Sequence, residues 1–207
     1  NGKFENITVK DGLSSNYIRS LHLDREGSLW IGTFGGGVNR LKNGKFSHLS
    51  TKEGLTSEIV RTIFADREGS IWLGTEGGGL NRFHFGKVQT ITKNDGLSHN
   101  FIRAVRQMSD GKIWVGTEGG GINIFENGRV VKTISNADGL TNNFITSIFE
   151  TKEKDVWVGT LEGLNLFKNG KIQQFRENNQ LAGSTVWAIE QMPDGAIWIG
   201  TAGGLSR

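Results

Sequence analysis

A tryptophan recurs along this chain at a nearly constant spacing, and no other feature restricts its possible folds as strongly. Successive copies lie 41 to 43 residues apart, and each is followed by an aliphatic residue and then by Gly-Thr. The five copies are Trp30, Trp72, Trp114, Trp157 and Trp198. An Asp-Gly-Leu turn, first at Asp11, and an Asn-Gly turn, clearest at Asn43, keep the same period. Three markers in phase indicate an internally repeated architecture.

Each repeat contains four short runs of β-forming residues. In the first repeat these runs cover residues 17–23, 29–33, 38–41 and 45–49, and turns rich in glycine separate them. Short runs rich in Ile, Val, Phe, Trp and Thr are typical of strands, and Asn-Gly is a strong hairpin signal. Four strands in every repeat of about 42 residues predict an all-β fold, a five-bladed β-propeller of four-stranded antiparallel blades. We expect the recurrent tryptophan to fill space between blades.

The two ends of the chain indicate how such a ring would close. The chain begins with a run of the fourth-strand type, residues 3–8, and ends with a run of the third-strand type, residues 204–207. We therefore expect the N-terminal strand to complete the last blade, which would remove an exposed sheet edge. On this interpretation residues 1–207 form a single propeller domain and a monomer. A fragment of a longer propeller, natural or engineered, would contain the same five repeats.

Composition excludes several classes of function. The 24 basic and 21 acidic residues give a net charge of only +3, with no run of Lys or Arg, so nucleic-acid binding has little support. No apolar stretch is long enough to span a membrane. With no cysteine there is no disulfide, thiolate zinc site or cysteine nucleophile. No two of the four histidines share a position in the repeat, so we predict no metal site and no cofactor.

The repeat unit from Asp11 to Phe46 resembles the two-component regulator propeller repeat. The resemblance rests on Gly-Leu, an Asn-rich turn, Gly-x-x-Trp-x-Gly-Thr and then Gly-Gly-Val-Asn-Arg. It implies the extracytoplasmic, periplasmic sensor region of a bacterial hybrid histidine kinase, and hence a signalling role. Members of the family usually have more repeats, often in seven-bladed rings, followed by an immunoglobulin-like segment, a membrane helix and a kinase. It also implies a small-molecule ligand, and the assigned ligands of the family tend to be oligosaccharides.

Candidate binding residues gather on one face of the predicted propeller. The Asp-Gly-Leu turns and the Gly-Thr turns lie on the same face, here called the top face. Asn100 and Asn143 come just after Asp-Gly-Leu turns. The next position in the repeat is aromatic in three of the five copies, as at Tyr17, and His99 directly precedes Asn100. Amides bond sugar hydroxyls and aromatic rings cover sugar C–H groups, so these residues suit an oligosaccharide. The alternative is that the Asn side chains bond the backbone of their own turns.

A second set of candidates occupies one position early in the first strand of each repeat. Arg19, Arg61 and Arg103 are equivalent, and Trp187 takes their place in the last repeat. Guanidiniums beside an aromatic ring could bind a uronate or a sulfate. The alternative is internal pairing, because Glu76 and Glu118 are predicted to lie in loops on the same face.

We predict a non-catalytic module that binds a small ligand, most simply an oligosaccharide, on the top face. Two alternatives remain: a trimmed or engineered scaffold without a ligand, and a propeller lyase or glycan-active enzyme. A pair such as Glu76 and Glu118 could serve acid–base chemistry. No Gly-x-Ser-x-Gly motif is present, and the scattered histidines argue against the lyase.

Overall fold

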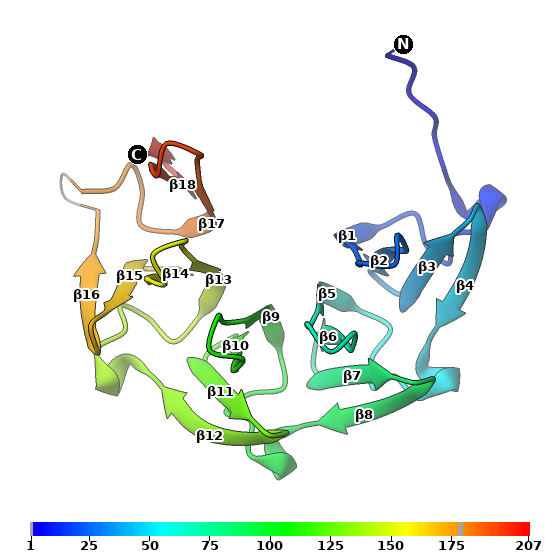
Figure 1. The fold of residues 1–207 in the computed structure, drawn as a ribbon, viewed down its shortest axis with the longest axis horizontal. Coiled ribbons are helices and arrows are strands. Elements are labelled where there is room, and N and C mark those ends of the chain that lie inside the picture. The colour runs from blue at the N-terminus through cyan, green and yellow to red at the C-terminus, as the bar shows by residue number, and fades with distance from the viewer. Residues whose placement is uncertain (1, 178–179) are drawn as a thin grey trace. The chain divides into compact units, whose positions relative to one another are not determined.

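The structure is a computed structural model that describes residues 2–177 and 180–207. It consists of five antiparallel sheets, and each sheet follows the chain in simple order from its first strand to its last (Figure 1). Each sheet corresponds to one repeat, and we call the sheets blades 1 to 5. The chain divides into two compact units, Asn1–Ile91 with blades 1 and 2, and Thr92–Arg207 with blades 3 to 5. The predicted all-β class and the five blades are confirmed. That residues 1–207 act as one domain stays a prediction.

The strands of the first unit have regular lengths. Blade 1 contains β1 (Ile18–Leu23), β2 (Leu29–Thr33), β3 (Val38–Lys42) and β4 (Lys45–Leu49); blade 2 contains β5 (Val60–Ala65), β6 (Ile71–Thr75), β7 (Leu80–His84) and β8 (Lys87–Ile91).

The second unit repeats the same pattern. Blade 3 contains β9 (Ile102–Gln107), β10 (Ile113–Thr117), β11 (Ile122–Glu126) and β12 (Arg129–Ile134); blade 4 contains β13 (Ile145–Glu150), β14 (Val156–Thr160), β15 (Gly163–Lys168) and β16 (Lys171–Phe175); blade 5 contains β17 (Val186–Gln191), β18 (Ile197–Thr201) and β19 (Gly204–Ser206).

The Asp-Gly-Leu turns are single turns of 3₁₀ helix with complete caps. They are η1 (Val9–Asp11), η2 (Thr51–Glu53), η3 (Lys93–Asp95) and η4 (Asn136–Asp138). A Ser or Thr before each turn and the acid at its end bond each other's backbone, which forms a capping box. The glycine that follows is left-handed, with φ +104° at Gly54, so the conformation favours glycine there. This local chemistry explains why Asp/Glu-Gly is the constant part of the marker.

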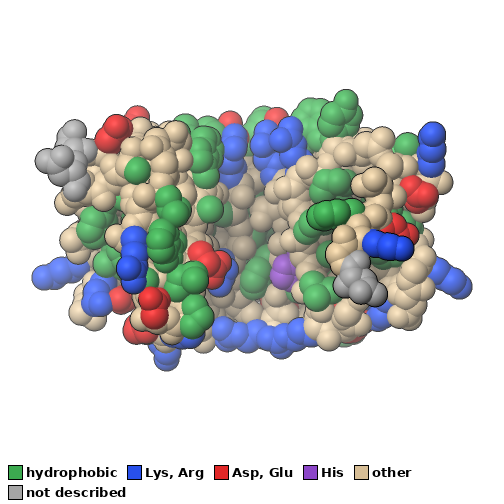
Figure 2. All heavy atoms as spheres, turned by 90° about the horizontal axis from the view of Figure 1, so that it is seen from above, with side chains coloured by type: hydrophobic (Ala, Val, Ile, Leu, Met, Phe, Trp, Pro, Cys, Tyr) green, Lys and Arg blue, Asp and Glu red, His purple; other side chains and the backbone are tan. Residues whose placement is uncertain are grey.

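Neighbouring blades within each unit pack through their apolar faces. In the first unit, Trp30 and Val38 of blade 1 form one cluster with Val60 and Ile63 of blade 2. In the second unit, Ile122 of blade 3 and Val158 of blade 4 belong to one core cluster. The recurrent tryptophan fills these interfaces as predicted, since the Trp30 and Phe83 rings lie 5.8 Å apart and the Trp114 and Phe167 rings 5.1 Å apart. On the face drawn in Figure 2, acidic and basic side chains lie together in several places, and a row of Lys and Arg side chains follows the lower edge.

A buried asparagine in the third strand ties each of blades 1 to 4 to the turn that precedes its first strand. In blade 1, Asn39 is fully buried; its Oδ1 accepts from the Ser14 N–H at 2.8 Å and its Nδ2 donates to Ser14 Oγ at 2.8 Å. The equivalent residues are Asn81, Asn123 and Asn165. Because buried amides without partners are costly, these complete pairs hold each turn in place on the sheet.

The predicted completion of the last blade by the N-terminal strand is wrong. Residues 2–8 form no strand, and the sheet of blade 5 contains β17, β18 and β19 (Figure 1). Phe4 is 100% exposed. The fourth strands that do form pair through a tight hairpin with the third strand just before them, as β4 does with β3. Residues 2–8 have the sequence pattern of such a strand, but the pattern alone does not supply the hairpin partner that fixes it.

Candidate functional site

The candidate arginines lie early on the first strands of their blades, and two of them are paired within their own blade. In the first unit, Arg61 donates from Nε to Glu76 Oε2 at 2.8 Å, and its terminal nitrogen lies 2.6 Å from the same oxygen. The side chains are 22% and 24% exposed. A half-buried, hydrogen-bonded pair of this kind already satisfies both charges, which is the internal pairing that the sequence left open.

The second pair, in the other unit, repeats this geometry and adds an aromatic contact. Arg103 donates from Nε to Glu118 Oε2 at 2.8 Å. Its guanidinium carbon lies 4.5 Å from the centroid of the Phe144 ring, which belongs to the turn before blade 4. Cation–π contact and ion pairing therefore hold Arg103 from two sides.

Arg19 differs from its two equivalents because its blade lacks the glutamate. Phe34 occupies the position of Glu76 and Glu118, and the Arg19 guanidinium carbon lies 5.1 Å from the Phe34 ring centroid. Among the described residues no carboxylate forms an ion pair with Arg19, and its side chain is exposed. Tyr17, whose carbonyl accepts from the Phe34 N–H, is 74% exposed, and Phe34 is 41% exposed. One cation and two aromatic rings thus remain open to solvent here.

The candidate amides serve the turns of the backbone. Asn100 Oδ1 accepts from the Lys93 N–H at 2.8 Å, and Asn143 Oδ1 accepts from the Asn136 N–H at 2.7 Å. The amide nitrogen of Asn143 also donates to Asn136 Oδ1 at 3.1 Å. Their side-chain oxygens therefore bond the backbone of the 3₁₀ turns, and only amide N–H donors are left for a sugar.

The remaining candidates lie in the second unit. His99 Nδ1 accepts from the Phe101 N–H at 3.2 Å, and the two rings lie 5.4 Å apart, so His99 supports its own turn. Trp187 on β17 is 53% exposed. It stands where blades 1 to 3 carry arginine and blade 4 carries Thr146, and the carbonyl of Val186 beside it accepts from Thr146 Oγ1 at 2.5 Å.

Sequence reasoning did not select Phe34 as a site residue. The available signal was the position of Glu76 and Glu118, which changes from acid to aromatic in the first repeat. In the described part of the chain, no cluster of three or more His, Cys, Asp or Glu side chains could hold a metal ion. No helix in that part is both long and apolar enough to cross a membrane.

Comparison with known proteins identifies the repeat. Four segments, residues 12–35, 54–77, 96–119 and 139–162, match the two component regulator propeller family. These four segments are therefore two-component regulator propeller repeats, as the resemblance of Asp11 to Phe46 predicts. No match was found among curated protein sequences.

Solved structures with the same fold include extracellular domains of two component systems. The chain is similar to the extracellular domain of a hybrid two component system from B. thetaiotaomicron, with 29% identity and a TM-score of 0.83 over 92% of this chain and 27% of that one. A second such domain from the same organism has 22% identity and a TM-score of 0.77, over 93% of this chain and 29% of that one. The chain thus spans less than a third of these relatives.

A virginiamycin B lyase from Staphylococcus aureus has the same fold at greater distance. Its identity is 15% and its TM-score is 0.68, over 92% of this chain and 69% of that one. Likeness at this level extends to the fold alone.

Proposed function

We propose that this chain is part of an extracytoplasmic sensor module and that it binds an oligosaccharide carrying an acidic group on its top face. The repeats and the likeness to extracellular domains of two component systems support the sensor role. In this proposal residues 1–207 act as one monomeric, periplasmic domain that binds its ligand without turnover.

The open arginine of blade 1 carries the ligand assignment. Arg19 lacks the carboxylate that engages Arg61 and Arg103, and it lies against the exposed Phe34 ring. A guanidinium recognises a carboxylate or sulfate through two parallel hydrogen bonds. The Tyr17 and Phe34 rings offer apolar faces to sugar C–H groups. Together these groups suit a uronate or a sulfated sugar better than a neutral one.

The glutamates give the enzymatic alternative little support. Glu76 and Glu118 each accept from an arginine at 2.8 Å, so neither carboxylate stands free to act on a bound sugar. A general acid or base needs a free path to the proton that it transfers.

The test is calorimetric titration of the chain with oligogalacturonate, and with a neutral gluco-oligosaccharide of equal length. We expect binding of the acidic sugar only, and a loss of at least about tenfold in affinity in Arg19→Ala, about 1.4 kcal/mol. Arg61→Ala is the matched control, because it removes an arginine that is already paired, and its affinity should stay within a few-fold of the native value.

The outcomes distinguish a ligand-binding module from a scaffold without a ligand and from an enzyme. Equal affinity in Arg19→Ala and the native chain would refute the assigned site. No binding of either sugar would favour a scaffold without a ligand. Chromatography of the sugar after long incubation checks for turnover, and shortened or unsaturated products would favour the enzyme.

A further inference from the structure

The second unit contains a pocket between blades 3 and 4, and it arises where two positions of the repeat, those of Asp24 and Arg40 in blade 1, change together. In blades 1 and 2 these two positions cover the recurrent tryptophan. Trp30 donates from Nε1 to Asp24 Oδ2 at 2.8 Å, and the Arg40 guanidinium lies 5.2 Å from its ring centroid. In blade 2, Asp66 and Arg82 make the same two contacts with Trp72. Trp30 and Trp72 are only 4% and 3% exposed as a result.

Blade 3 lacks both covering groups. Met108 stands at the position of the aspartate, and Ile124 pairs with Trp114 in the register where Arg40 pairs with Trp30. Trp114 is only partly buried, and within residues 2–177 and 180–207 no group accepts a hydrogen bond from its Nε1–H. A buried or half-buried indole normally finds such a partner. Here the partner is missing because the sequence has replaced it.

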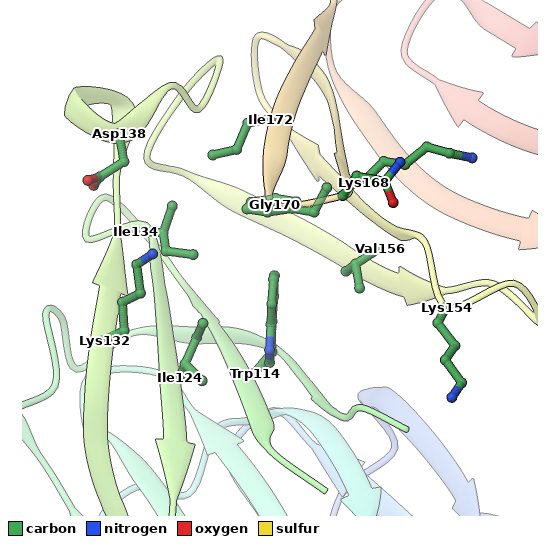
Figure 3. Close-up of a pocket in the computed structure, with 12 residues that line it drawn as sticks. Trp114, Ile124, Lys132, Ile134, Asp138, Lys154, Val156, Lys168, Gly170 and Ile172 are labelled. Carbon is green, nitrogen blue, oxygen red and sulfur yellow. The ribbon is translucent and has the colours of Figure 1, made fainter. Parts of the chain in front are cut away.

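The uncovered tryptophan forms the floor of a cavity of about 540 Å³ between blades 3 and 4 (Figure 3). Its size lies within the range of small-molecule sites. In Figure 3 the Trp114 ring lies between Ile124 and Val156, and Ile172 closes the far side. Phe167 meets Trp114 edge-on, with the ring planes at 84°. Apolar and aromatic side chains line most of the interior, so the occupant needs an apolar body.

The charged side chains that line the pocket indicate which polar group a ligand would carry. The lining contains three lysines, Lys132, Lys154 and Lys168, and one acid, Asp138. Lys168 already pairs with Asp155 at 2.6 Å, and Asp138 accepts from the Ser135 N–H and Oγ within its capping box.

Lys132 is the cation best placed to meet a ligand. In Figure 3 its amine lies beside Ile134 on the pocket side, whereas Lys154 and Lys168 extend away. Among the described residues no carboxylate lies within ion-pair distance of Lys132, and the neighbouring Asp138 carboxylate, which Lys132 stabilises electrostatically, is already bonded to Ser135. The anionic head group of a ligand would supply the missing partner.

We propose that this cavity binds a small organic acid, with an aromatic or branched apolar body on Trp114 and a single carboxylate at Lys132. The Trp114 N–H is a second donor for the ligand. This site is independent of the oligosaccharide site, since the two use no residue in common.

The test uses 4-phenylbutyrate as the acid and 4-phenylbutyramide as its neutral match. The chain is labelled with 5-fluorotryptophan, and its fluorine resonances are followed during titration; Trp114→Phe assigns the resonance of residue 114. We expect the acid to move that resonance and to bind at least about tenfold more tightly than the amide. Lys132→Gln should remove the preference for the acid and leave the affinity for the amide unchanged.

A variant taken from the chain's own repeats provides the second arm. Ile124→Arg places over Trp114 the arginine that blades 1 and 2 carry, and it should abolish binding while the other tryptophan resonances keep their positions. The proposal is overturned if the acid does not bind the native chain, if it binds without moving the Trp114 resonance, or if acid and amide bind equally. Because Lys132 is exposed, Lys132→Gln keeps the test decisive even if Ile124→Arg fails to fold.

Discussion

The interface between blades 1 and 2 and the interface between blades 3 and 4 are built from the same repeat, yet only the first one covers its tryptophan completely. At the first, Asp24 accepts from the indole of Trp30 and Arg40 lies over the ring. At the second, Met108 and Ile124 take these positions and the Trp114 ring faces a cavity. The fold tolerates both versions because the apolar cluster beneath the tryptophan is present in each.

The comparison separates residues that specify the blade from residues that specify its surface. The tryptophan, the Gly-Thr pair and the buried asparagine recur in blades 1 to 4 whichever version is present. Asp24 and Arg40 lie at positions that vary, and their change opens a binding surface without loss of a strand. Variation at such positions is how a repeat protein acquires sites on an unchanged frame.

The largest expected effect on stability comes from truncating Trp30 or Trp114 to alanine. Trp30→Ala removes a side chain that is 4% exposed, and truncation of a buried aromatic costs about 3–5 kcal/mol. Trp114→Ala should cost clearly less, because Trp114 is partly exposed, has no hydrogen-bond partner for its N–H among the described residues and already borders a cavity. Denaturant unfolding of both variants measures the difference. Equal losses would mean that the two interfaces are energetically alike.

The next effect concerns the carboxylate of blade 1. Asp24→Met copies the residue of blade 3 and leaves the Trp30 Nε1–H and the Ser28 and Glu26 N–H groups without their acceptor. Lost partners of partly buried donors cost about 1–3 kcal/mol in total stability. Asp24→Asn is the control, because it keeps the size of the side chain and one acceptor oxygen, and it should lose less.

The same carboxylate predicts a dependence on pH. Burial raises the pKa of Asp24, but hydrogen bonds from Trp30, Ser28 and Glu26 outweigh it and hold the pKa below its ordinary value of 3.8. A lowered pKa in the folded state stabilises the protein above the unfolded pKa, and this contribution is lost as pH falls through the folded pKa. The difference in unfolding free energy between the native chain and Asp24→Met should therefore shrink below about pH 4. A difference that is constant from neutral to acid pH would contradict the assignment.

A smaller effect is expected when the network of blade 1 is installed in blade 3. Met108→Asp alone places a carboxylate at a site only 3% exposed without the arginine that blades 1 and 2 carry over their tryptophan, so it should destabilise the chain. Met108→Asp combined with Ile124→Arg should recover stability, with a favourable coupling of about 0.5–3 kcal/mol in a double-mutant cycle. Additive effects would show that the aspartate and the arginine of blades 1 and 2 act separately.

The smallest effect is expected from Arg40→Ala, which removes the cation over Trp30 and a hydrogen bond to Ser28 Oγ at 3.0 Å. An exposed cation–π contact contributes about 0.5–1 kcal/mol. Arg40→Ile, the residue type of blade 3, should behave similarly and should raise the exposure of Trp30. Thermal unfolding and acrylamide quenching of the fluorescence measure the two consequences.

The repeat period was enough to predict the blades, their strands and the position of Trp30 between sheets, because local turn chemistry and a fixed spacing determine them. The sequence does not determine the role of Asn100 and Asn143, since an amide beside a turn can bond either its own backbone or a sugar. The pairing of Arg61 with Glu76 was likewise an open alternative. The strand predicted near the N-terminus does not form in residues 2–8, because strand pairing depends on a partner that the local pattern does not contain. The cavity over Trp114 depends on side-chain packing between blades, which no single motif encodes.

The buried asparagines also bear on how a chain of this kind can grow. Asn39 and its partner Ser14 are 25 residues apart and lie within one repeat, as do the equivalent pairs of the next three repeats. A duplication or deletion of one whole repeat therefore adds or removes the asparagine together with its partner and leaves no buried amide without a partner. Each copy arrives as a self-consistent genetic unit, and the number of blades can change by recombination between repeats without any compensating mutation at this position.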